Sequence, residues 1–504
     1  MKVGVGYCDN PDSTLAGRLA AEEALAAAHQ PGICDLVLLF CTARHDQKAL
    51  RREVAKTTGN YSSIYGGGAA GIITNDNFGY AGDQVGVACI WLNESQCNIV
   101  CQGGLAAGGE FGSGVELAKK LVHTGASEDS PIMLFYDAVN GAADSNTRLL
   151  MGTWLLEGIE KQLGPMLTVL GGGLIGDHIL TPTKQFVGDR MDKHQTIALT
   201  FSKDIQINCV SLNPCYPASP YYTVTKADGP MILEINNKPA ITFMDQILGS
   251  SIKPEEYPFL LSLGINYGNS GENYNENNYV CRSCQGIDTE RDGIIMFEPD
   301  MTAGTKFQVM SRSFGLDYIY PKVENLLDAL GDNQPVFAFY IDCAGRCAGF
   351  GGTDNEDARV IQDIVGNRFP LFGVYTGGEI APVGGRSRSL DWTGVFCVFT
   401  QGEGSSNKIE TTLGRVGSQD KADLSKQHKG FSYNQTEELC MQNLSKVLTL
   451  GNQNIALRNE LEQKRRGLSL LAEQSVSLKG LADPENIFYS MTQRINAALN
   501  MQKT

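Results

Sequence analysis

Two stretches in the second half of the chain decide the fold: VFAFYIDCAGRCAGF, residues 336–350, and FPLFGVYTGGEIAPVGG, residues 369–385. Each begins with an apolar run whose length and composition are typical of a buried strand. The first run ends at a cysteine and an arginine, and the second ends at two glycines and a glutamate. Such adjoining strand ends are expected in a catalytic centre, in a binding cradle or in a tightly packed junction.

The same pattern occurs three times along the chain. The first strands of the three units begin at Leu36, Ile132 and Val336. Each is followed by a polar loop, a helix with apolar spacing near 3.6, a strand that ends in glycines and a further apolar strand. The glycine clusters lie at Gly66, Gly171 and Gly377. The units start at unequal intervals, so the pattern favours divergent duplication within a mixed α/β fold over a solenoid of fixed period. Chance similarity among β-α-β units would also produce such a pattern.

Changes in composition and hydrophobic pattern along the chain predict its domains. Residues 1–215 hold the first two units, and residues 220–402 hold the third, preceded by a hairpin with an Asp-Gly turn and several short strands. Residues 403–435 are polar and lack a strand pattern, which predicts a flexible linker. Residues 436–504 favour helix, and their imperfect heptads would suit dimerisation or signalling.

Composition excludes several classes of protein. The chain has 504 residues, with Lys+Arg 41 against Asp+Glu 56 and a net charge of −15, which disfavours nucleic acid as a partner. It has neither a signal-peptide pattern nor an apolar run of about 18 residues, so we expect a cytoplasmic protein without a transmembrane helix. Its 14 cysteines are then expected to be thiols, and many lie in apolar strands.

Several ordered motifs resemble a known family. They are YYTVTKADGPMILEINNKPA, YVCRSCQGID, MTAGTKFQVMSRS, CAGR and FGVYTGGEIAPVGG. In this order they resemble the C-terminal half of FIST-domain proteins, and the first two units look like the N-terminal half. The resemblance covers most of residues 1–402. It implies repeated β-α-β-β units in two FIST halves, with mixed sheets covered by helices, followed here by a C-terminal helical extension.

The resemblance also implies a function. FIST-domain proteins are thought to be intracellular signal-transduction sensors that bind small ligands, among them amino acids, and that act on a signalling output protein. Some bacterial members bind haem and sense nitric oxide. The positions that match the family motifs are Arg282, Cys343, Arg346, Tyr375, Gly377, Gly378 and Glu379. The N-terminal half departs from the family at GGGAAGIITND, which lacks a glutamate at the matching place.

The chemistry of these residue types favours a zwitterionic ligand. An arginine offers bidentate recognition of a carboxylate, and a glutamate accepts an amine. The glycines would turn the backbone with positive φ and bring N–H groups close to a ligand. Alternatively, Glu379 forms a purely structural bridge to Arg346 or Arg282. The glycine clusters match neither a P-loop nor a dinucleotide fingerprint.

The cysteines allow an enzyme or a metal site. Cys343 would be a catalytic thiol if Arg346 lowered its pKa, but a buried structural cysteine is the simpler interpretation, and no complete catalytic constellation is visible. Cys281, Cys284, Cys343 and Cys347 could supply four zinc ligands, although the first pair lies within a predicted strand, where alternate side chains point to opposite faces.

The sequence is also compatible with a haem-based nitric-oxide sensor or with an interaction scaffold. For haem, His178 or His45 would ligate the iron, with His178 favoured because the neighbouring glycines leave room for a planar cofactor. The scaffold hypothesis rests on the long helical tail, which could also form a homodimer.

Overall fold

The computed structural model describes residues 1–80, 82–92, 96–141, 149–249, 252–268, 275–313, 315–347 and 356–402. The predicted linker at 403–435 and the predicted helical extension at 436–504 lie outside these residues. No helix within the described ranges is long and apolar enough to cross a membrane.

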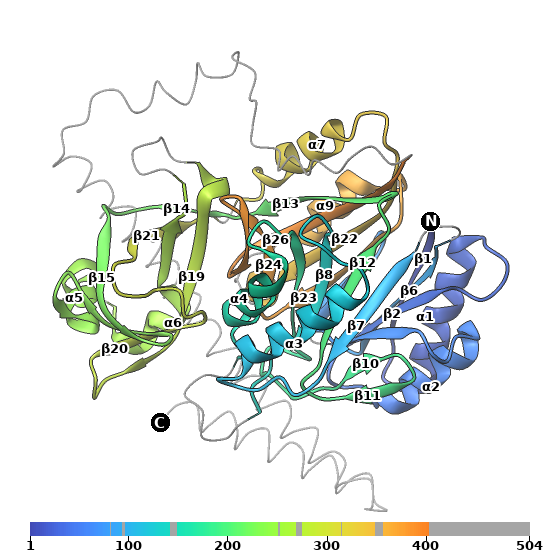
Figure 1. Ribbon diagram of the computed structural model, residues 1–504, viewed down its shortest axis with the longest axis horizontal. Helices are drawn as coiled ribbons and strands as arrows, with labels where there is room; N and C mark the ends of the chain where they lie inside the picture. Colours follow the sequence, from blue (N-terminus) through green and yellow to red (C-terminus); the bar gives the residue numbers. More distant parts are fainter. Residues whose placement is uncertain are drawn as a thin grey trace, which may run out of the picture. The chain divides into compact units, whose positions relative to one another are not determined.

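Three six-stranded mixed sheets form most of the structure (Figure 1). In spatial order, sheet one contains β1 (Lys2–Asp9), β6 (Gln84–Trp91), β2 (Leu36–Cys41), β3 (Ile64–Gly68), β10 (Gln185–Val187) and β11 (Arg190–Asp192). Sheet two contains β25 (Arg386–Leu390), β24 (Glu379–Val383), β9 (Val169–Leu174), β8 (Ile132–Asp137), β12 (Thr196–Phe201) and β7 (Cys97–Gln102). Sheet three contains β13 (Ile205–Leu212), β26 (Gly394–Gln401), β22 (Pro335–Cys343), β23 (Leu371–Thr376), β4 (Gly71–Thr74) and β5 (Phe78–Tyr80).

The three sheets share one plan, which confirms the mixed α/β fold of repeated units. In each sheet two successive strands pair in parallel: β2 with β3, β8 with β9, and β22 with β23. The last strand of the same repeat (β6, β12 or β26) lies antiparallel to the first. We call these units repeats one, two and three.

Each repeat gives one hairpin to another repeat's sheet. The hairpin β4–β5 of repeat one pairs with β23, β10–β11 of repeat two pairs with β3, and β24–β25 of repeat three pairs with β9. Repeat one thus gives its hairpin to repeat three, repeat three gives its hairpin to repeat two, and repeat two gives its hairpin to repeat one. The three repeats are therefore joined in a closed cycle of backbone hydrogen bonds.

The strand register explains the repeated glycines. Gly66, Gly171 and Gly373 occupy the same position in the second strands. A Cβ there would lie 2.1, 1.8 and 2.5 Å from the carbonyl oxygens of the equivalent residues Leu39, Leu134 and Tyr340. Since no side chain fits so close to the backbone, each repeat requires a glycine. The register also shows that the third equivalent glycine is Gly373 and not Gly377.

Pairs of helices accompany the repeats. Repeat one has α1 (Ser13–Ala28) and α2 (Gln47–Thr58), repeat two has α3 (Glu110–His123) and α4 (Gly152–Leu163), and repeat three has α7 (Ile319–Ala329) and α9 (Asp357–Val365). The members of each pair pack against each other. Figure 1 shows α3 and α4 together, and these helices contact β7 and β25 of sheet two. Their close approach depends on Gly114 and Gly158, where a Cβ would lie 2.2 and 2.1 Å from a carbonyl oxygen of the facing helix.

An eight-stranded antiparallel sheet is inserted within repeat three, between β13 and α7. Its main path runs β14 (Cys215–Pro217), β21 (Lys306–Arg312), β15 (Tyr222–Asp228), β16 (Met231–Ile235), β20 (Gly293–Met296), β19 (Tyr279–Asp288) and β18 (Ser262–Asn266), with β17 (Lys238–Pro239) beside β16. The helices α5 (Ala240–Leu248) and α6 (Tyr257–Leu260) belong to the same segment. The expected Asp-Gly hairpin is Asp228–Gly229, between β15 and β16. The domain boundary near residue 215 stays a prediction, and β13, which precedes it, pairs with β26 of repeat three.

Aromatic side chains fill the space where the three sheets meet. Phe40, Phe135, Phe339 and Phe372 come from all three repeats, and their ring centroids lie 5.2–6.2 Å apart. Such tilted and edge-to-face contacts are favourable geometries for aromatic rings.

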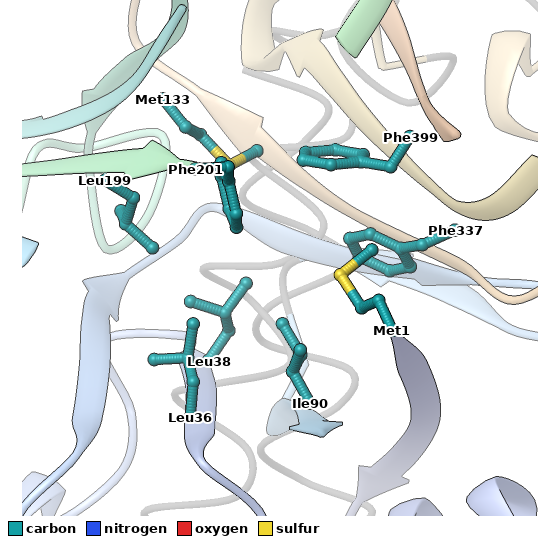
Figure 2. Close-up of a pocket in the computed structure, with 9 residues that line it drawn as sticks. All are labelled: Met1, Leu36, Leu38, Ile90, Met133, Leu199, Phe201, Phe337 and Phe399. Atoms are coloured by element: carbon teal, nitrogen blue, oxygen red, sulfur yellow. The ribbon is translucent and has the colours of Figure 1, made fainter. Parts of the chain in front are cut away.

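Figure 2 shows a small apolar pocket beside this cluster, with the side chain of Met1 pointing into it. It is lined by Met1, Leu36, Leu38, Ile90, Met133, Leu199, Phe201, Phe337 and Phe399. Its volume of about 10 Å³ is that of a single water, and its lining offers no polar side chain. This pocket is therefore part of the core and not a ligand site.

Candidate functional site

The predicted site residues converge at one corner of repeat three. We use "corner" for the place where the ends of a repeat's first two strands meet the start of its last strand. In repeat three, β22 ends at Cys343 and a short turn, Ala344–Arg346, follows. β23 ends at Thr376, and Gly377 and Gly378 lead directly into β24, which joins sheet two.

The two glycines form the junction between repeats two and three. The Gly377 N–H donates to the Gly173 carbonyl oxygen and the Gly173 N–H donates to that of Gly378, both at 2.8 Å. Neither Gly377 nor Gly378 has a positive φ, so the prediction of a left-handed turn at these glycines is wrong. Gly377 is required for another reason: a Cβ there would lie 2.7 Å from the Ile175 side chain.

Glu379 begins the exchanged strand and is fully buried. Its carboxyl group accepts from the Thr376 hydroxyl at 3.0 Å and from the Thr393 N–H at 3.5 Å. Burial raises the pKa of Glu379 well above its usual range, and the nearby acids Asp342 and Asp391 raise it further. The neutral acid is therefore the favoured form at this position.

Arg346 is also buried and is paired with groups other than Glu379. It makes ion pairs with Asp342, at 3.5 Å, and with Asp357. It also donates to the Tyr318 hydroxyl at 2.7 Å and to the Trp392 carbonyl oxygen at 3.2 Å. The expected bridge between Arg346 and Glu379 is absent from the ion pairs of the described residues.

Arg282 approaches the corner from β19 of the inserted sheet. Its guanidinium binds both Asp300 carboxylate oxygens at 2.7 Å and donates to the Ser389 carbonyl oxygen at 2.9 Å. Asp391 lies 3.9 Å away. Burial opposes ionisation of Asp300, but Arg282 outweighs it and holds the pKa of that carboxyl below its ordinary value. Arg282 thus fixes the inserted sheet to repeat three and does not meet Glu379.

Three buried acids at the corner were not predicted from the sequence. Burial raises the pKa of Asp342 to about 6 and that of Asp391 to about 7, and it also raises the pKa of Glu298. Glu298 accepts from the N–H groups of Gly152 and Thr153 at 3.0 and 2.9 Å, at the start of α4. The signal was available for Asp342, because a single acid inside an apolar strand needs a partner.

Tyr375 contributes its hydroxyl to a cluster at the edge of the corner. The hydroxyl donates to Glu356 at 3.5 Å, and Tyr80 donates to the same carboxylate. The Tyr80 and Tyr375 rings meet edge to face at 5.5 Å. Since Tyr80 belongs to the exchanged hairpin of repeat one, side chains of repeats one and three meet at this place.

The four cysteines considered for a reactive thiol or a zinc site, Cys281, Cys284, Cys343 and Cys347, are buried thiols. Burial raises the pKa of Cys343 well above its usual range, so the expectation that Arg346 lowers it is wrong. The Cys281 thiol donates to the Cys215 sulfur at 3.4 Å, while the Cys284 thiol donates to the Gly286 carbonyl oxygen. Within the described ranges, no three His, Cys, Asp or Glu side chains are placed to hold a metal ion.

The two candidate haem ligands have partners within the protein. Both ring nitrogens of His45 are in contact with oxygens, one with Ser13 at 3.1 Å and the other with the Asp83 carbonyl at 2.9 Å. His178 uses Nε2 to donate to the Ala344 carbonyl oxygen at 3.0 Å. Iron ligation by His45 would break one of these contacts, and haem ligation by His45 stays a prediction. Haem ligation by His178 stays a prediction.

Comparisons with known proteins identify related sequences for both halves of the chain. The family model described as FIST N domain matches residues 35–238, and that described as FIST C domain matches residues 240–382. FIST domains are associated with signal-transduction sensing. The order of the two matches agrees with the order of the motifs in the sequence.

Similar curated proteins come from mycobacteria. "Uncharacterized protein Rv0628c" of Mycobacterium tuberculosis (strain ATCC 25618 / H37Rv) is 26% identical over 250 residues, which are 49% of this chain and 64% of that protein. "Uncharacterized protein Mb0898c" of Mycobacterium bovis is 27% identical over 190 residues, 37% of this chain and 48% of that protein. The chain thus spans about half to two thirds of the length of these relatives.

A solved structure of cyanuric acid hydrolase from A. caulinodans aligns with a TM-score of 0.24 and 12% identity, over 40% of this chain and 71% of that one. A likeness at this level carries no argument about fold or function.

Proposed function

Because the chain belongs to the FIST family, we propose that it is a small-molecule-binding sensor in signal transduction and that it catalyses no reaction. One observation carries the proposal: the strand ends of repeats two and three are joined by the Gly173 hydrogen bonds to Gly377 and Gly378, directly before the buried Glu379. A ligand at this corner contacts two repeats at once.

The mechanism we propose is a population shift. A ligand that fits one arrangement of repeats two and three better than another stabilises that arrangement by its difference in affinity. The change would then reach a signalling output protein through the C-terminal residues. The raised pKa of the buried Cys343 thiol supports a sensor over a thiol-dependent enzyme, because the thiolate is the nucleophilic form.

The proposed ligand is an amino acid or a similar zwitterion, and the corner sets conditions for it. Gly345 and Gly377 are half-buried, so the backbone of the corner is partly exposed. The Arg346 guanidinium already holds Asp342 and Asp357, so a ligand carboxylate has to compete with these acids. A ligand ammonium beside Glu379 would favour its ionised form, so binding would release to solvent the proton that this carboxyl holds in the free protein.

Thermal unfolding with each of the twenty standard amino acids tests this proposal. Binding to the folded state alone raises the midpoint by an amount that grows with the ratio of ligand concentration to Kd. We expect at least one amino acid to raise the midpoint of the wild type. Glu379→Gln, which keeps the shape of the neutral acid, should abolish that shift.

Glu234→Gln, on strand β16 of the inserted sheet and away from the corner, is the matched control and should keep the shift. If the wild type responds to no amino acid, or if Glu379→Gln responds as the wild type does, the zwitterion site is wrong.

A further inference from the structure

The corner of repeat two has the same backbone frame as that of repeat one. The Asp137 N–H donates to the Gln195 carbonyl oxygen at 2.9 Å, as the Thr42 N–H donates to that of Gln84 at 3.0 Å. The carbonyl oxygens of the preceding residues, His194 and Asp83, likewise accept hydrogen bonds from the N–H groups of Leu105 and Asn10, at 3.1 and 3.2 Å. Gln195 and His194 are therefore the counterparts of Gln84 and Asp83.

An acid closes the corner of repeat one. Asp9 lies opposite Gln84 in the strand pair. Its two carboxylate oxygens accept from the Asp83 N–H and from the Gln84 amide, both at 2.9 Å. This one exposed side chain therefore occupies both polar groups of the corner, the Asp83 N–H and the Gln84 amide.

A glycine takes the place of this acid in the corner of repeat two. The strand pair that matches Gln102 with Thr196 brings Gly103 opposite Gln195, and a Cβ on Gly103 would lie 2.7 Å from the Gln195 amide nitrogen. An open hollow of about 480 Å³ lies at the surface here. It is lined by Cys101, Gly103, Gly104, Leu105, Ala106, Lys120, Arg190, Asp192, Lys193, His194 and Gln195.

The side chains that line the hollow are mainly cationic, although the whole chain carries a net charge of −15. The lining contains the cations Lys120, Arg190 and Lys193 and one carboxylate, Asp192, which lies 3.6 Å from Arg190. Lys120 donates to the Cys101 carbonyl oxygen at 3.0 Å. Burial raises the pKa of the Cys101 thiol to about 11, while Arg190 and Lys120 both oppose this rise, as expected for two cations close to the same thiol.

His194 is held in place at the wall of the hollow. Its φ of 54° lies in the left-handed region, which is unfavourable for a residue other than glycine. Its N–H donates to the Asp137 carboxylate at 2.9 Å, and its Nδ1 lies 3.6 Å from the same carboxylate. The orientation of His194 beside the hollow is therefore fixed by the Asp137 carboxylate.

We propose that this hollow binds a small molecule carrying a phosphate or carboxylate group, with Arg190, Lys193 and Lys120 as the anion contacts. Guanidinium and ammonium donors make strong hydrogen bonds to such oxyanions. Arg190 lies on β11 at the edge of sheet one, and the Cys101 strand β7 is the edge of sheet two. A bound anion would therefore bridge two sheets at a site separate from the corner of repeat three.

Calorimetric titration of the full chain with inorganic pyrophosphate and with citrate tests the proposal and separates the two oxyanions. We expect one of them to bind the wild type with a Kd below the millimolar range. Arg190→Gln with Lys193→Gln should weaken that binding by about tenfold or more, which is about 1.4 kcal/mol or more of binding free energy, because two cationic donors to the anion are lost. Lys119→Gln with Lys184→Gln removes the same charge outside the lining and should leave the Kd within about twofold, as expected for screened surface charges.

An equal loss of anion affinity in the two double variants would mean diffuse attraction to surface charge and would overturn the proposal. The absence of binding by both anions would overturn it as well. Glu379→Gln should bind the anion as the wild type does, so this result is independent of the proposed amino-acid site.

Discussion

The corners of repeats two and three begin from the same backbone and end with different chemistry. His194 and Trp392 occupy equivalent positions before the last strand of their repeats, and both are left-handed, with φ of 54° and 55°. At repeat three the inserted sheet covers this position, and the Arg312 guanidinium lies 3.7 Å from the centre of the Trp392 ring. At repeat two the equivalent residue, His194, lines the hollow.

The difference shows how burial decides what a cation does. In repeat three the guanidinium of Arg282 is 1% exposed and is bound by acids and carbonyl oxygens. In repeat two the side chain of Arg190 is 63% exposed and has one carboxylate at 3.6 Å. The first arginine holds parts of the protein together, and the second remains available to a ligand.

Truncating the two arginines should separate these roles, and this is the largest effect we expect. Arg282→Ala leaves Asp300 buried without its counter-ion, which costs about 3–5 kcal/mol of the free energy of unfolding. Arg190→Ala removes an exposed pair and should change that free energy by less than about 0.5 kcal/mol. Urea unfolding of both variants measures the difference.

A double variant checks the cause of the loss. Arg282→Met with Asp300→Leu removes both charges and should be more stable than Arg282→Ala, because no buried charge is left unpaired. If Arg282→Ala were as stable as Arg190→Ala, the buried network would not be what fixes the inserted sheet.

The buried acids of repeat three predict a pH dependence of intermediate size. Burial raises the pKa of Asp391 from 3.8 to about 7, so between these values the folded state holds a proton that the unfolded state has released. The free energy of unfolding therefore falls as pH rises from about 4 to about 7, with a slope of up to about 1.4 kcal/mol per pH unit from this group.

Asp391→Asn lacks this proton, so the stability of the wild type relative to this variant should decrease over the same range. Urea unfolding at pH 4.5, 5.5 and 6.5 measures the decrease. A difference that stays constant or grows with pH would mean that Asp391 is ionised in the folded protein throughout.

The sequence predicted the repeats because their cause is local. Apolar strands of similar length recur, and the tight approach of Gly66, Gly171 and Gly373 to a neighbouring strand leaves a mark in the sequence that a single chain can reveal. No sequence pattern indicates the exchange of hairpins, because β4, β10 and β24 have the composition of ordinary strands that could also pair within their own repeats. Only the packing of the whole chain decides between the two arrangements.

Side-chain partners were harder to predict than strand ends. The motifs brought Arg346 and Glu379 to one corner, but the acids that bind the arginine, Asp342 and Asp357, lie outside the glycine motif. The hollow of repeat two was missed because its decisive feature is a glycine, Gly103, at the position that Asp9 occupies in repeat one. A missing side chain gives no signal until the register of the two repeats is known.

The smallest expected effect concerns the single carboxylate in the hollow. Asp192→Asn frees Arg190 from its neighbour and should tighten the binding of the preferred anion by about twofold to fivefold, the range of an exposed ion pair of about 0.4–1 kcal/mol. The gain should shrink between 50 and 300 mM salt, roughly as the Debye length shortens. Asp129→Asn, on an exposed loop, removes the same charge and should change the Kd little. Weaker binding by Asp192→Asn would mean that this carboxylate positions Arg190 for the anion, because a competitor's removal can only strengthen binding.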